Sequence, residues 1–140
     1  MLKRNRFFAI VVALFPLACG PATEHRSEIH GEVTLDGEPI QAGAILFLPT
    51  DPTRSATAGA EIKNGRYSIE RDKGPGVGLY RVEIRASKKS GKQVQKAMGQ
   101  PGELMDEMVE AVATRFNAQS ELTFDVKLGV NTANFTAASK

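Results

Sequence analysis

The chain has 140 residues, one cysteine, no tryptophan, 13 glycines and a formal net charge of +2 at pH 7. Without Lys3, Arg4 and Arg6 at its start, 15 basic residues face 16 acidic ones. A nearly neutral chain lacks the basic surface that nucleic-acid binding needs, and one cysteine with two histidines offers neither a disulfide nor a zinc-type ligand set. The length fits a single domain, and the frequent glycine favours a turn-rich β protein.

The first nineteen residues have the pattern of a secretory signal. After the basic start, residues 7–17 form an apolar stretch of eleven residues, which is shorter than the ~20 that a membrane-spanning helix needs. Small Ala18 then precedes Cys19, where a cleavage site wants a small side chain. The run Pro16-Leu17-Ala18-Cys19 resembles the lipobox of bacterial lipoproteins, although Pro16 stands where leucine is usual.

This resemblance implies a signal peptide at 1–18, cleavage between Ala18 and Cys19, and a lipid on the Cys19 thiol that attaches the protein to a bacterial membrane outside the cytoplasm. Gly20 is not the aspartate that retains such lipoproteins at the inner membrane, so the outer membrane or cell surface is favoured. An ordinary secreted protein with a free thiol is the alternative. Polar residues 19–28 are then predicted to form a flexible tether.

Strand-like alternation begins at Ile29. Residues 29–35 form the first predicted strand, and Asp36-Gly37 is a strong turn signal because both residues tolerate positive φ. Residues 44–48 form a second strand, which is apolar throughout and therefore expected to be covered on both sides.

Three more strands follow with the same alternation. They are predicted at 58–63, at 67–69 after the hairpin turn Asn64-Gly65, and at 79–86.

Residues 87–119 interrupt the alternation as one long excursion. Its first part is basic, with Lys88, Lys89, Lys92 and Lys96. Its second part predicts a short amphipathic helix at 103–113, because apolar residues recur there at helical spacing: Leu104, Met105, Met108, Val109 and Val112. This stripe is expected to cover the open end of the domain or to dock a partner. The lysines either lie in a solvated loop or contact anionic glycans, wall polymers or lipid headgroups.

Alternation returns at 122–128, which predicts a sixth strand. A turn at 129–131 and a last strand at 132–136 follow, before a tail at 137–140. Seven short strands predict an all-β domain at 29–136, an antiparallel β-sandwich of the prealbumin or immunoglobulin type. The side chains expected in its core are Val33, Leu35, Ile45, Phe47, Tyr67, Ile69, Tyr80, Val82, Ile84, Leu122, Phe124, Val126 and Phe135.

Five segments carry a family resemblance: GEVTLDGEPI at 31–40, NGRYSI at 64–69, GLYRV at 78–82, RFN at 115–117 and SELTFDV at 120–126. Together they resemble the carboxypeptidase regulatory-like, transthyretin-like domains of bacterial extracytoplasmic lipoproteins. The resemblance implies a seven-stranded prealbumin-like sandwich and no activity.

Two enzyme families with this architecture provide a test. Hydroxyisourate hydrolases end in Tyr-Arg-Gly-Ser, whereas this chain ends in Thr-Ala-Ala-Ser-Lys. Intradiol dioxygenases hold iron with two tyrosines and two late histidines, but here His25 and His30 precede Tyr67 and Tyr80. We therefore expect no catalytic residues, no metal and no cofactor.

The sequence predicts a non-catalytic, lipid-anchored protein of the cell envelope, with a structural or accessory role. The alternative is a module that binds a carbohydrate or an envelope protein through residues 87–119. Its contact residues would be Lys88, Lys89, Lys92, Lys96, Met105 and Met108.

Overall fold

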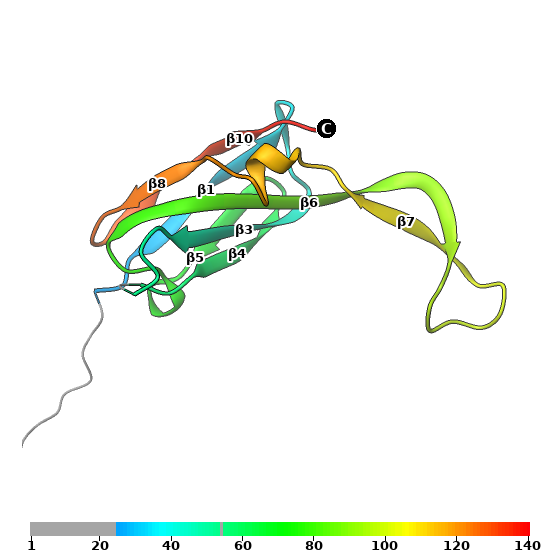
Figure 1. Ribbon diagram of the computed structural model, residues 1–140, viewed down its shortest axis with the longest axis horizontal. Coiled ribbons are helices and arrows are strands. Elements are labelled where there is room, and N and C mark those ends of the chain that lie inside the picture. The colour runs from blue at the N-terminus through cyan, green and yellow to red at the C-terminus, as the bar shows by residue number, and fades with distance from the viewer. Residues whose placement is uncertain (1–24, 54) are drawn as a thin grey trace, which may run out of the picture.

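The structure is a computed structural model that describes residues 25–53 and 55–140. The predicted signal peptide, the cleavage site at Ala18 and the lipid on Cys19 lie outside these residues. The described part is mostly β and forms a curled, largely antiparallel sheet (Figure 1). Its elements are β1 (Glu28–Leu35), β2 (Glu38–Pro39), β3 (Ala42–Pro49), β4 (Ala58–Lys63), β5 (Arg66–Ile69), η1 (Arg71–Lys73), β6 (Gly78–Gln95), β7 (Leu104–Glu110), η2 (Thr114–Phe116), β8 (Thr123–Val126), β9 (Val130–Thr132) and β10 (Phe135–Ala137).

The two predicted turns of the first half are confirmed. Asp36 and Gly37 have φ of 53° and 89°, and Asn64 and Gly65 have φ of 50° and 76°. Two consecutive residues with positive φ define the hairpin turn that matches the natural twist of paired strands. These turns join β1 to β2 and β4 to β5.

The sheet follows the order β10-β1-β5-β4-β3-β6-β7, with β8 paired to the start of β6 and β9 paired to the start of β1. β8 and β9 are joined by residues 127–129 alone, so two distant edges of the sheet meet. Asn131 fixes this meeting, because its Oδ1 accepts the Lys127 backbone N–H at 2.9 Å. The sheet is therefore curled around its own apolar face.

Four aromatic rings lie at the centre of the curl. The Phe47 ring centroid on β3 is 6.2 Å from each of three rings, those of Tyr67 on β5, Phe124 on β8 and Phe135 on β10. Such edge and tilted contacts add to the stabilisation from buried area. Nine of the thirteen predicted core residues are buried, and Leu35, Leu122, Phe124 and Phe135 are partly buried against them.

Several boundaries differ from the predictions. The last predicted strand, 132–136, is divided into β9 and β10, and Val130 and Asn131 belong to β9 and not to a turn. Leu46 and Leu48 of β3 are only partly buried, so the expected cover on both sides of this strand is wrong. Together with the short β2 and with β7, this division gives ten strands in the described residues in place of seven.

The described end of the predicted tether and the predicted tail are both bonded to the fold. Ser27, placed in the tether, is buried, and its hydroxyl donates to the Lys127 carbonyl at 2.7 Å. Ser139, placed in the tail, donates its backbone N–H to Asp36 Oδ1 at 3.0 Å and pairs with Val112.

The predicted helix at 103–113 is wrong. β6 is eighteen residues long and runs from Gly78 to Gln95. β7 returns antiparallel to it, with Ser87 paired to Glu110 and Gln95 paired to Leu104. We call the resulting β-hairpin, residues 87–110, the arm. It extends away from the curled sheet, which we call the body (Figure 1).

Candidate functional site

The arm is a direct continuation of a core strand. Within β6, Tyr80, Val82, Ile84 and Ala86 point into the body and are buried. From Ser87 onward the same strand is exposed. The pairing with β7 is irregular between Lys89 and Gln93, and such an irregularity bends and twists a ribbon. The arm is thus positioned by a strand that the core holds rigidly.

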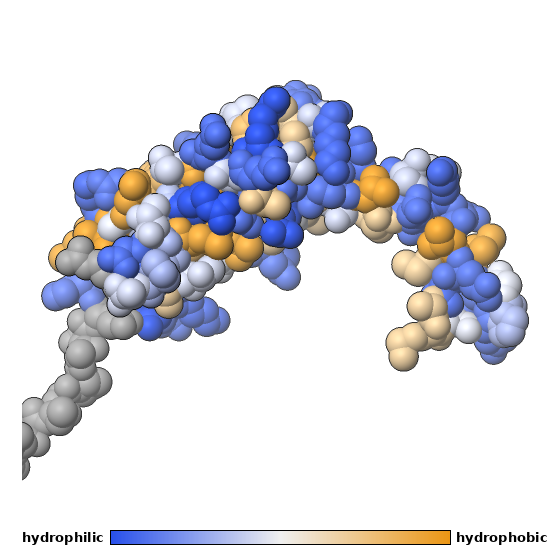
Figure 2. Space-filling view, in the orientation of Figure 1, coloured by the Kyte–Doolittle hydropathy of each residue, from blue (hydrophilic) through white to orange (hydrophobic). Residues whose placement is uncertain are grey.

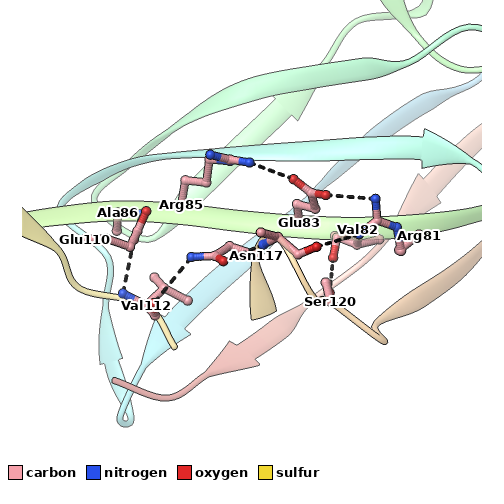
Figure 3. A network of polar contacts seen from close by, with 10 residues as sticks. Arg81, Val82, Glu83, Arg85, Ala86, Glu110, Val112, Asn117 and Ser120 are labelled. Carbon is pink, nitrogen blue, oxygen red and sulfur yellow. Dashed lines mark hydrogen bonds and ion pairs between the residues drawn. The ribbon is translucent and has the colours of Figure 1, made fainter. Parts of the chain in front are cut away.

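Glu110 fastens the arm at its root (Figure 3). Its Oε1 accepts the backbone N–H of Ala86 and that of Val112, each at 3.1 Å. The Ala111 N–H also donates to the Ala86 carbonyl at 2.8 Å. One carboxylate therefore joins the outgoing and returning chains where both pass into the body.

The returning segment, residues 111–122, then follows the edge of β6. The hydroxyl of buried Ser120 donates to the Val82 carbonyl, and the Val82 N–H donates to the Leu122 carbonyl at 2.8 Å. Asn117 Nδ2 donates to the Val112 carbonyl at 3.4 Å. These bonds satisfy the polar groups of a segment without regular strand pairing.

A buried carboxylate lies beside this segment on the outer face of β6. Glu83 alternates with the inward-facing residues of β6 and so lies on its outer face, yet its side chain is only 7% exposed, because Arg81 and Arg85 flank it at 2.9 and 3.0 Å (Figure 3). Arg81 also donates to the Ala118 carbonyl at 3.5 Å. Paired on both sides, Glu83 serves to hold the edge of the sheet.

The arm carries most of the exposed apolar side chains of the described residues. Five of them are 39–97% exposed: Val94, Met98, Leu104, Met105 and Met108. Figure 2 shows apolar patches among the polar residues of the arm. The expected cover for the end of the domain is therefore not formed by Leu104, Met105 or Met108. Of the predicted stripe, Val112 alone is fully buried.

The lysines of the arm do not form a positive surface. Lys89 forms an ion pair with Asp106, and Lys96 with Glu103 at 2.7 Å. The pair lowers the pKa of Asp106 and raises that of Lys89. Lys88 and Lys92 complete four basic residues, which the four acidic residues of β7 and its turn balance. The predicted basic stretch is thus locally neutral, and attraction of anionic polymers has no support from its geometry.

The two histidines and two tyrosines that could correspond to an iron site do not form one. The Tyr67 hydroxyl is buried and donates to the Ala133 carbonyl at 2.7 Å, whereas the Tyr80 hydroxyl donates to the Gly76 carbonyl at 3.0 Å. His30 contacts the Thr132 hydroxyl at 3.1 Å on the surface, and His25 lies where the described chain starts. Within residues 25–53 and 55–140, no three His, Cys, Asp or Glu side chains lie close enough to share a metal ion.

Two open hollows adjoin the loops at the start of β6. One of ≈ 510 Å³ is lined by Thr50, Leu79 and Tyr80, among others, and one of ≈ 210 Å³ by Lys73 and the loop 74–77. Ser55 lines both hollows, and its hydroxyl bonds the Tyr80 hydroxyl and accepts the Gly76 N–H. Neither of these partners is a general base that could activate a nucleophile.

Comparisons with family models, with curated proteins and with solved structures gave no match to this chain. In the described part of the chain, no helix has the length and apolar character required to cross a bilayer. The arm is accordingly the candidate site that the geometry itself distinguishes.

Proposed function

We propose that this chain is a non-catalytic, lipid-anchored protein of the bacterial cell envelope that binds a protein partner through its arm. The main support for this proposal is the set of five exposed apolar side chains on a hairpin that continues a core strand. Exposed apolar groups that gather on one projecting element are typical of protein interaction sites. A rigid scaffold presenting a recognition element is also a common arrangement.

The chemistry of the arm favours a protein over a carbohydrate as its partner. Residues 87–110 contain no aromatic side chain, and sugar rings are usually bound by stacking on aromatic rings. Three of the five exposed apolar residues are methionines, whose flexible thioethers adapt to irregular protein surfaces. The neutral charge of the arm gives an acidic glycan no advantage.

The anchor is supported by Cys19 and by the chain's entry into the body. Residues 20–24 separate the cysteine from the first described residue, His25. Two or more acyl chains give stable membrane attachment where one does not. Metabolic labelling with palmitate should mark the protein and should fail with Cys19→Ser; label that persists in this variant would contradict the anchor.

We interpret the curled sheet as a prealbumin-like sandwich related to the carboxypeptidase regulatory-like domains. The interpretation is supported by the two Gly-containing hairpin turns at their expected positions and by the aromatic cluster that joins β3, β5, β8 and β10. It implies a binding role or a structural one, since such an architecture by itself specifies no chemistry.

The decisive experiment is crosslinking in intact cells with a C-terminally tagged chain. A triple variant, Leu104→Ser with Met105→Ser and Met108→Ser, removes apolar surface from the arm. Lys92→Ser with Gln100→Ser changes two exposed polar residues of the same arm and serves as the matched control. We expect a partner that the wild type and the control capture equally and that the triple variant captures at least tenfold less.

Equal capture by all three chains, or recovery of abundant envelope components alone, would contradict the binding role. The protein would then be a structural or accessory module of the envelope.

A further inference from the structure

Outside the arm, the exposed large apolar side chains of the described residues gather at one end of the body. They are Val77, Leu79, Leu128 and Val130, which are 49–64% exposed. Val77 and Leu79 lie on either side of the first residue of β6, Leu128 lies in the turn between β8 and β9, and Val130 is the first residue of β9. Burial in the core does not explain these four side chains, so their exposure requires another explanation.

This end is also where the chain enters the fold. The Ser27 N–H donates to the Pro75 carbonyl, two residues before Val77, and the Glu28 N–H donates to the Gly129 carbonyl, between Leu128 and Val130, each at 2.9 Å. β1 and β9 pair Glu28 with Val130, and β6 and β8 pair Gly78 with Val126. The four apolar residues therefore lie at the end of the body where the described chain begins.

The length of the segment between Cys19 and His25 places this end close to the proposed lipid. Five residues, 20–24, lie between Cys19 and His25, so the chain takes six residue-to-residue steps, and a fully extended chain spans at most ~3.5 Å per step. The entry point is therefore within about 20 Å of a lipid carried by Cys19. The arm projects from the opposite end of the body (Figure 1).

The charges around the four residues indicate whether this end would bind lipid headgroups or the apolar part of the bilayer interface. Lys127 is paired with Asp125, and Arg26 donates to the Asp72 carbonyl at 3.1 Å. Basic and acidic residues alternate in the neighbouring loop, where Arg71 and Lys73 lie beside Glu70 and Asp72. Without an excess of basic charge, attraction to anionic headgroups is weak. Contact with the apolar side of the interface is favoured instead.

We propose that the end of the body bearing Val77, Leu79, Leu128 and Val130 rests on the bilayer that carries the anchor, with these side chains in the lipid interface. The proposal rests on the lipid-anchored function proposed above. It fixes the orientation of the protein: the body lies against the membrane through this end, and the arm is directed away from the surface towards its partner.

Spin labelling of the membrane-bound protein tests the orientation. Leu128→Cys and Met105→Cys each introduce one thiol for a maleimide nitroxide, on the proposed membrane end and on the arm, respectively. Collision rates with oxygen, which concentrates in lipid, and with a water-soluble nickel complex then report the surroundings of each label. We expect the label at position 128 to favour oxygen over nickel at least fivefold more than the label at position 105.

Cys19 provides the control that separates the two proposals. A lipidated Cys19 has no free thiol, so the unsubstituted protein should take up no nitroxide; labelled wild type would overturn the anchor itself. With wild type unlabelled, equal nickel accessibility at positions 128 and 105 would overturn the membrane contact alone. A label at 128 shielded from both reagents would indicate a protein partner at this end and would also overturn it.

A second measurement varies the lipid. The labelled protein is reconstituted in phosphatidylethanolamine vesicles that contain increasing amounts of anionic phosphatidylglycerol, and the oxygen preference is measured again. Because the end is not basic, the oxygen preference at position 128 should stay within twofold. A contact that appears only with anionic lipid would contradict the apolar mode.

Discussion

At the scale of single residues, Gly31 on β1 lies where the curled sheet leaves no room for a side chain. A Cβ built there would lie 1.9 Å from the Ala133 carbonyl oxygen, which is backbone and cannot move aside easily. The same oxygen accepts the Tyr67 hydroxyl at 2.7 Å, and burial raises the pKa of Tyr67. The close approach of β1 to the segment after β9 therefore requires glycine at position 31, because glycine has no Cβ.

Gly31→Ala should lower the free energy of unfolding by at least about 2 kcal/mol, because overpacking against backbone forces strands apart. Urea denaturation followed by circular dichroism measures the change. Glu32→Ala is the control in the same strand; it removes an exposed ion pair with Arg66, which is worth about 0–1 kcal/mol. Equal midpoints for the two variants would contradict the close packing.

Asp36 makes the attachment of the C-terminal residues dependent on pH. Hydrogen bonds from Ser139 hold the pKa of Asp36 below its usual value, with a smaller effect from Lys88. A lowered folded pKa means that the contact is fully present above the unfolded pKa of about 3.9 and is lost as the pH falls through the lower folded value. The C-terminal residues should therefore loosen only in acid.

The amide chemical shift of Ser139 in NMR should follow this titration, with a midpoint below pH 3.9. In Asp36→Asn, the titration should disappear, while the turn persists because asparagine also tolerates positive φ. A Ser139 titration that remains in this variant would show that another group is responsible.

At the scale of elements, the arm is held by a few backbone contacts at its root. Glu110→Ala would leave the N–H groups of Ala86 and Val112 without this acceptor, and both residues are buried. We expect a loss of about 1–3 kcal/mol, together with faster hydrogen exchange of these two amides. Glu107→Ala is the matched control, since Glu107 accepts an exposed Ser90 hydroxyl; it should change stability by less than about 0.5 kcal/mol.

The sequence predicted the elements with local signals well and the arm badly. The turns at Asp36-Gly37 and Asn64-Gly65 depend on residues that are adjacent in sequence. The alternation in β1, β4 and β6 indicates that each of these strands has one buried face. In the arm, Leu104, Met105, Met108 and Val109 fit helical spacing, but they also fit a ribbon whose two faces are both exposed. Pairing with β6, which decides between these structures, is not visible in a local pattern.

For the same reason, the sequence predicts the region of the candidate site but not its structure or its charge. Residues 87–119 stood out because they interrupt the alternation, and this pointed to the right region. The neutral charge of the arm was hidden, because Lys89 meets Asp106 and Lys96 meets Glu103 only through the hairpin. The apolar end of the body was hidden too, since Val77 and Leu128 are brought together by pairing between β6 and β8.

At the scale of the whole molecule, the exposed apolar residues separate into two groups at opposite ends, with a closed core between them. The core ends at Ala86 on the outgoing strand and resumes at Val112 on the return. No residue of the arm belongs to it. Stability and the proposed recognition therefore depend on different residues, and we expect that the arm can be removed without opening the body.

A chain in which residues 90–107 are replaced by Asn-Gly tests this separation. Lys89 and Met108 are directly paired, so a two-residue turn fits between them without changing the register. The free energy of unfolding should change by less than about 1 kcal/mol, because the deleted residues bury no core surface, and crosslinking of the proposed partner should be lost. In the intact protein, the arm amides should exchange through local opening well before those of β3 and the first half of β6. A fall in stability as large as that of Glu110→Ala would mean that the arm packs on the body, and its apolar side chains would then need no partner to explain them.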